Sequence, residues 1–152
     1  MTVSLRPVEP PDLEAFYEQQ VDPVAVGMAA VPPRSHADHM KHWREVLADD
    51  SANVRTIVVD GDVAGHVVSF LRDGVGDREV GYWIARSHWG RGVATAALSA
   101  FLAEEPRRPL VAHTAVNNPG SRRVLEKNGF TVTAEVKDPM GDGIDEVHLR
   151  LD

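Results

Sequence analysis

The feature that most constrains the fold is a β-prone segment that passes through two glycines into a helix. Residues 80–85 are rich in aromatic and β-branched side chains, which favour a strand. Gly90 and Gly92 follow, and the apolar residues after them recur at helical spacing from Val93 to Phe101. A strand that leads so directly into a helix is typical of layered domains, in which helices pack against a sheet.

The rest of the chain contains further strands and helices in a mixed order. Strands are expected over residues 2–6, 55–59, 63–71, 80–85, 110–116, 130–136 and 146–151, and helices near 10–21, 35–47, 93–101 and 119–128. Asp60 and Gly61 between two β-rich runs predict an antiparallel hairpin. The order is neither a strict alternation nor all-β, so we expect an α/β fold (α+β layered) with a mixed sheet of about seven strands. No linker or repeat divides the 152 residues, which predicts a single domain over 1–152.

Composition excludes several classes of protein. Cysteine is absent, which excludes disulfides, cysteine zinc sites and a cysteine nucleophile. No apolar run approaches the roughly 18 residues of a membrane helix, and the first residues lack the apolar core of a signal peptide. We therefore expect a cytoplasmic protein with no membrane partner.

The charge of the chain is unevenly distributed. The net charge is −7, which makes the chain a poor nucleic-acid binder. Residues 86–127 nevertheless carry seven Lys or Arg and three acids, a local balance of +4, which leaves −11 for the remainder. Either the basic residues cluster by chance, or this segment holds a polyanionic ligand.

The glycine turn is suited to an oxyanion. Glycines let backbone N–H groups turn toward a ligand, the helix start adds unpaired N–H donors, and Arg91 adds a full charge. A tight turn without a ligand, a dinucleotide fingerprint and a coenzyme A pyrophosphate site all fit a bare Gly-x-Gly. The dinucleotide interpretation requires a third glycine where Thr95 stands and an acid about 20 residues beyond the first glycine, and neither is present.

A second motif distinguishes among these interpretations. It runs from Asn118 to Phe130 and follows the pattern Asn-x-x-Ser, then Glu-Lys-x-Gly-Phe. Together with residues 89–94, which match Gln/Arg-x-x-Gly-x-Gly/Ala except for Trp89 at the first position, it resembles the GNAT superfamily of N-acetyltransferases. The branch that it resembles most is that of the ribosomal-protein N-terminal acetyltransferases.

The resemblance implies both a fold and a cofactor. It implies a mostly antiparallel sheet with helices on both faces and one splayed parallel strand pair, ending at Ala85 and Val116. Acetyl-CoA would lie between these strands, with no metal. The implied cofactor-binding residues are Trp83, Ile84, Trp89, Gly90, Arg91, Gly92, Val93, Ala94, Thr95 and Asn118. Arg91, Arg122 and Arg123 all stay candidates for the ribose phosphate.

The resemblance also implies direct attack of a primary amine on the thioester. Glu79 is the candidate base, and Ser121 is the candidate acid because Leu125 occupies the position where many relatives carry a tyrosine. A backbone N–H near Ile84 would polarise the thioester carbonyl. The missing tyrosine keeps an alternative open, a non-catalytic acyl-CoA-binding sensor or subunit on the same fold.

The acceptor is the least determined part of the reaction. The first third of the chain covers the acceptor in the family, and here it is acidic, which favours a cationic amine. A peptide N-terminus and a small molecule such as a polyamine, amino acid or aminoglycoside all stay open. A homodimer is implied by the resemblance alone.

Histidines offer no metal site by their spacing. His36, His39 and His42 recur every third residue, and such steps drift by about 60° around a helix, so the three rings cannot easily converge. His88 and His113 stand near the proposed cleft, and we expect both to be structural.

Overall fold

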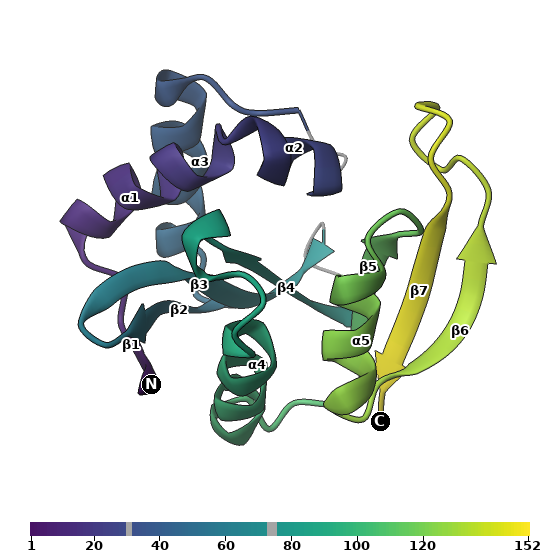
Figure 1. The fold of residues 1–152 in the computed structure, drawn as a ribbon. Coiled ribbons are helices and arrows are strands. Elements are labelled where there is room, and N and C mark those ends of the chain that lie inside the picture. Colours follow the sequence, from purple (N-terminus) through teal and green to yellow (C-terminus); the bar gives the residue numbers. More distant parts are fainter. Residues whose placement is uncertain (30–31, 73–75) are drawn as a thin grey trace.

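Within residues 1–29, 32–72 and 76–152, which the computed structural model describes, seven strands form one sheet in the order β1-β2-β3-β4-β5-β7-β6 (Figure 1). The strands are β1 (Val3–Arg6), β2 (Asn53–Val59), β3 (Asp62–Leu71), β4 (Arg78–Ile84), β5 (Leu110–Ala115), β6 (Thr131–Val136) and β7 (Glu146–Leu151). Neighbouring strands are antiparallel except for β4 and β5, which are parallel. The expected mixed sheet with one parallel pair is confirmed.

Helices cover both faces of this sheet, as expected (Figure 1). On one face lie α1 (Pro10–Gln20), α2 (Pro23–Ala29) and α3 (His36–Ala48), and on the other α4 (Val93–Glu104) and α5 (Pro119–Lys127). A short 3-10 turn, η2 (Arg86–His88), connects β4 to the segment before α4. None of the helices in the described residues is long and apolar enough to cross a membrane.

Local sequence signals account for most element boundaries. Asp60 and Gly61 adopt the left-handed φ values of 49° and 90° that a tight hairpin between β2 and β3 requires. The side chain of Asn118 accepts a hydrogen bond from the Ser121 N–H at 3.2 Å and so caps α5. Gly129, at a φ of 92°, follows the end of the same helix.

Two boundaries differ from the sequence-based expectation. The apolar run after Val24 begins as helix α2, because Asp22 accepts hydrogen bonds from the backbone N–H groups of Val24 and Ala25. The part of that run at residues 30–31 lies outside the described residues. Strand β4 begins at Arg78 rather than Val80, since Arg78 pairs with Leu110 and is buried.

The core lies in two layers, one on each face of the sheet. The larger cluster joins the sheet to α4 and α5 and includes Val93, Phe101, Leu110 and Leu125. The smaller cluster holds α1 and α3 together through Leu13, Phe16 and Trp43. Burying this apolar surface supplies the dominant favourable free energy of folding, and it fixes both helical layers relative to the sheet.

The parallel strands β4 and β5 separate soon after they begin. In the described residues their pairing consists of Arg78 with Leu110 and Glu79 with Val111, although each strand continues for several residues more. The later part of each strand therefore has backbone groups directed toward a gap between the strands.

Candidate functional site

A cavity of about 400 Å³ lies where β4 and β5 separate. Its walls come from β4, the glycine turn, the start of α4 and one side of α5 along its length, with Ala25 of α2 also lining it. Nine of the ten residues expected to bind a cofactor line it, namely Trp83, Ile84, Trp89, Gly90, Gly92, Val93, Ala94, Thr95 and Asn118. The tenth, Arg91, is exposed and does not line the cavity. Two segments about 28 residues apart in sequence thus meet around one space.

The glycine turn presents backbone donors to this cavity. Gly90 and Gly92 have φ values of 72° and 76°, which side chains other than glycine rarely adopt. Gly92 directly precedes α4 and has no side chain to cap it, so the first N–H groups of the helix stay available to a ligand. The positive end of the helix dipole lies at the same place, which favours an anion.

Two cations of α5 strengthen the positive potential of the cavity. Arg123 and Lys127 both line it. Arg122, one of the three arginines considered for a ribose phosphate, does not line the cavity, and its Nε lies 3.1 Å from Oε1 of Glu126. Of those three arginines, Arg123 is therefore the one whose position suits a phosphate in this cavity.

Trp89 has a contact that the sequence motif did not indicate. Its indole Nε1 donates a hydrogen bond to the carbonyl of Ile84 at 2.8 Å, while the side chain stays 39% exposed. This contact ties the turn to the last residue of β4. The tryptophan thus stabilises the turn. From the sequence motif, the Gln or Arg that is usual at this position was expected only to contact a phosphate.

Ser121 belongs to a pair of hydroxyl groups inside the cavity. Its Oγ lies 2.9 Å from the Oη of Tyr82, which comes from β4 and also lines the cavity. Burial raises the pKa of the Tyr82 phenol, so it is protonated at neutral pH. Leu125, at the position of the family's tyrosine, is buried in the core. Sequence analysis missed Tyr82, although its place in the strand that leads to the glycine turn was a usable signal.

Glu79 lies at the last paired position of β4 and β5, outside the residues that line the cavity. Its two carboxylate oxygens accept hydrogen bonds from Arg72 at 2.6 and 2.8 Å. These hydrogen bonds lower the pKa of Glu79 despite partial burial, so the group is ionised at neutral pH but is a weak base. Its assignment as base stays a prediction.

The histidines of α3 do not gather, as their spacing indicates. His39 is buried and its Nε2 lies 2.8 Å from the carbonyl of Leu13, whereas His36 is exposed beside Glu14. His42 is half-buried and stands edge-on to Trp43. His88 lines the cavity, and its Nδ1 lies 3.1 Å from the Ser87 hydroxyl.

Comparison with known proteins identifies the family that the sequence motifs resemble. The family model described as "Acetyltransferase (GNAT) domain" matches residues 2–131. A Bacillus subtilis (strain 168) protein with the provisional name ribosomal N-acetyltransferase YdaF is 30% identical over 149 residues, which is 90% of this chain and 81% of that protein. The ribosomal-protein-serine acetyltransferase of Escherichia coli (strain K12) is 34% identical over 77 residues, or 47% of this chain and 43% of that protein.

Solved structures show the same fold. The spermidine N-acetyltransferase of Vibrio cholerae, solved with CoA and spermine, superposes with a TM-score of 0.84. The alignment covers 98% of this chain and 94% of the other at 18% identity. At that identity the likeness concerns the fold alone.

Proposed function

The chain belongs to the GNAT family of acetyltransferases, and we propose that it transfers the acetyl group of acetyl-CoA to a primary amine by direct attack, without an acyl-enzyme. One observation carries this proposal. The cavity between β4 and β5 has anion-binding backbone donors at the glycine turn and the hydroxyl pair of Tyr82 and Ser121 in its wall. The pyrophosphate and the thioester of acetyl-CoA each have a matching group in this cavity.

The proposed cofactor position follows from these groups. The pyrophosphate binds the N–H groups around Gly90 and Gly92, with Arg123 and Lys127 neutralising phosphate charge. The pantetheine arm runs along the free edge of β4 near Trp83 and reaches Asn118. The acetyl group then lies close to the point where the two strands separate.

In the proposed reaction the neutral amine nitrogen forms a bond to the thioester carbon, and the carbon–sulfur bond breaks. The thiolate that leaves takes a proton from the Ser121 hydroxyl, which Tyr82 holds in place and can resupply. When the new bond forms, the nitrogen becomes positively charged, and the proton that it then loses passes to Glu79 through water, because Glu79 lies outside the residues that line the cavity and Arg72 donates to both of its carboxylate oxygens. A backbone N–H near Ile84 polarises the carbonyl, and positioning of the two reactants supplies much of the rate.

The acceptor we propose is a cationic amine, either a peptide N-terminus or a small molecule. Residues 10–50 contain eight acids and three Lys or Arg, so the helical layer over the acceptor side attracts positive charge. Among similar proteins, one is named for ribosomal protein serine and another was solved with spermine. A homodimer and a cytoplasmic location stay predictions of the sequence.

The test is thermal unfolding with acetyl-CoA, with CoA and with NAD as a control. A ligand at a hundredfold excess over its Kd should stabilise the protein by about 2.7 kcal/mol. Stabilisation by the two CoA ligands, together with amine-dependent release of free thiol, is the expected result. If acetyl-CoA binds but no amine of a panel causes release of free thiol, the alternative function is favoured. That alternative is a non-catalytic acyl-CoA-binding protein, which the absence of a tyrosine at Leu125 leaves open. No stabilisation by either CoA ligand would contradict the proposal.

A matched pair of glycine variants locates the binding site. Gly92→Glu places a carboxylate at the anion-binding turn and should abolish CoA binding. Gly61→Glu is the control, since Gly61 has a similar left-handed φ of 90° and open surroundings but lies in the β2–β3 hairpin. Both variants carry similar backbone strain, so unchanged CoA affinity in Gly92→Glu would exclude the turn as the site.

A further inference from the structure

Two histidines on neighbouring strands lie side by side on the same face of the sheet. His113 of β5 is the register partner of His148 of β7. Their rings are stacked, with centroids 3.9 Å apart and an angle of 11° between the planes. Two imidazoles in this position offer ring nitrogens on the same side of the sheet, and imidazole is a good ligand for zinc and related metals.

A carboxylate completes the group. Glu146 is two residues before His148 on β7 and therefore lies on the same face of the sheet. Its Oε1 is 3.3 Å from the Nε2 of His148. One ligand atom from each of His113, Glu146 and His148 lies within 4.8 Å of the others. Among the residues that the structure describes, no other group of three potential metal ligands lies this close together.

The electrostatics of this group suit a cation. Glu79, on the adjacent strand β4, contributes little free negative charge because Arg72 pairs with it. The carboxylate of Glu146 lies beside the two imidazoles and supplies the negative charge of the group.

From this geometry we propose that His113, His148 and Glu146 form a binding site for a divalent transition metal of the zinc class. Two imidazoles and one carboxylate are a ligand set that zinc adopts, with a fourth position open to water. Ligand atoms around a tetrahedral zinc lie roughly 3.3 Å apart, so the stacked rings must rotate out of their parallel arrangement when the group closes around a metal. His113 is exposed and its partners are half-buried, which leaves room for those rotations.

The site is separate from the acetyl-CoA cavity. None of the three residues lines that cavity. Leu110 and Ala112 of β5 are buried in the cluster under α4 and α5, so His113, which alternates with them, lies on the opposite face. A site on the face that α1 to α3 partly cover was not expected from the sequence, where His113 was interpreted as structural and no metal was expected.

The test is calorimetric titration of the tag-free, chelator-treated protein with Zn²⁺. We expect one equivalent to bind, and His113→Ala and His148→Ala each to weaken binding at least about tenfold, since even outer partners of metal ligands contribute 10- to 100-fold. His36→Ala is the matched control. His36 Nε2 lies 2.8 Å from Glu14 Oε1, a pair of histidine and carboxylate that is exposed, whereas His148 and Glu146 are half-buried and have His113 beside them. Equal Zn²⁺ affinity in His113→Ala and the unchanged protein would overturn the proposal.

A second measurement needs no variant of the site. Imidazole resonances of the unchanged protein are followed by NMR as substoichiometric Zn²⁺ is added. Those of His113 and His148 should change first and together. If the histidines of α3 respond first, or if none responds, the proposed site is excluded. Because neither measurement uses acetyl transfer, failure here would leave the proposed enzymatic function untouched.

Discussion

The two ends of the β4–β5 strand pair are built on opposite principles. At the closed end, Arg78 and Glu79 pair with β5, and buried charges hold the surrounding segments together. At the open end, the strands part around a cavity lined by glycine backbone and two hydroxyl groups. Helix α4 connects the two ends, since it begins at the glycine turn and ends beside Glu105.

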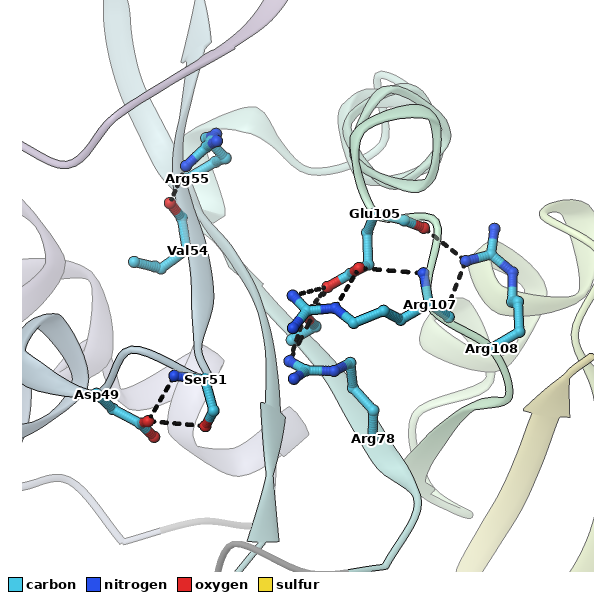
Figure 2. A network of polar contacts seen from close by, with 9 residues as sticks. Asp49, Ser51, Val54, Arg55, Arg78, Glu105, Arg107 and Arg108 are labelled. Atoms are coloured by element: carbon cyan, nitrogen blue, oxygen red, sulfur yellow. Dashed lines mark hydrogen bonds and ion pairs between the residues drawn. The ribbon is translucent and has the colours of Figure 1, made fainter.

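The closed end contains a network of ion pairs and hydrogen bonds (Figure 2). Glu105 is fully buried and accepts hydrogen bonds from Arg107 at 2.8 and 2.9 Å, and from the hydroxyl of Ser69. Arg78, also buried, donates to the same Ser69 hydroxyl at 3.1 Å. The network thus joins β3, β4 and the segment after α4 at the place where β5 begins.

The comparison shows how the same pair of strands is held together at one end and separated at the other. A buried carboxylate whose hydrogen bonds are all made by the protein fixes its neighbours, because breaking any partner leaves a buried charge unpaired. Backbone N–H groups at a helix start have no partner within the protein and so stay available to a ligand. Mutations at the closed end should therefore lower the free energy of unfolding, and mutations at the open end should change ligand binding.

The largest expected effect is that of Glu105→Gln at the closed end. It leaves Arg78 without its buried counter-charge, which lies 3.9 Å away, and should lower the free energy of unfolding by about 3–5 kcal/mol. Urea unfolding measures this loss. The control is Glu104→Gln, one residue earlier, where an exposed carboxylate lies 3.5 Å from Arg55 and the loss should be below about 1 kcal/mol.

Binding of CoA to the folded Glu105→Gln protein should be unchanged if the two ends are independent. A parallel fall in CoA affinity would show instead that the network also sets the width of the open end.

The same carboxylate should make stability depend on pH. Burial alone would raise the pKa of Glu105, but hydrogen bonds from Arg107 and Ser69 lower it from an ordinary 4.5 to about 2. Its stabilisation is therefore fully present above about pH 4.5 and is lost as pH falls toward about 2, by up to about 3 kcal/mol. The difference in urea midpoint between the unchanged protein and Glu105→Gln should narrow over this range. If the difference in urea midpoint between the two proteins stays constant from pH 6 to pH 3, Glu105 is not the group whose protonation lowers the stability.

At the open end, Ser121→Ala should lower kcat by about a hundredfold, the usual contribution of a positioned general acid, while CoA affinity changes little. Ser99→Ala, at an exposed position of α4, is the control for loss of a helical serine. Steady-state rates of thiol release with an active amine test this prediction. A kcat within about twofold of the unchanged enzyme would show that the thiolate leaves without help from this hydroxyl.

The smallest effect is expected for Tyr82→Phe, which keeps the ring and removes the Oη beside Ser121. Loss of one partly buried hydrogen bond should cost about 1 kcal/mol of stability. Its effect on kcat should be smaller than that of Ser121→Ala, and no further loss is expected in the double variant, because the tyrosine acts through the serine. Additive losses in kcat would mean that Tyr82 reaches the cofactor itself.

Much of the candidate cofactor site could be predicted from the sequence because its signals are local. The glycines of the turn, the cap residue Asn118 and the apolar stripe of α4 each lie within one short segment, where neighbouring residues determine the geometry. Nine of the ten expected cofactor residues accordingly line one cavity. Arg91 differs because a charged side chain in a turn is free to point to solvent, and sequence does not fix its direction.

The side-chain pairs that join separate elements could not be predicted in this way. Tyr82 and Ser121 are 39 residues apart, Ser69 and Glu105 are 36 apart, and His113 and His148 are 35 positions apart in the printed sequence. Alternation along a strand shows which residues share a face, but not which strand lies alongside or in which register. The sequence by itself determined the elements, the glycine turn and the family. The tertiary structure decided which distant side chains meet, because strand order and register exist only once the sheet has assembled.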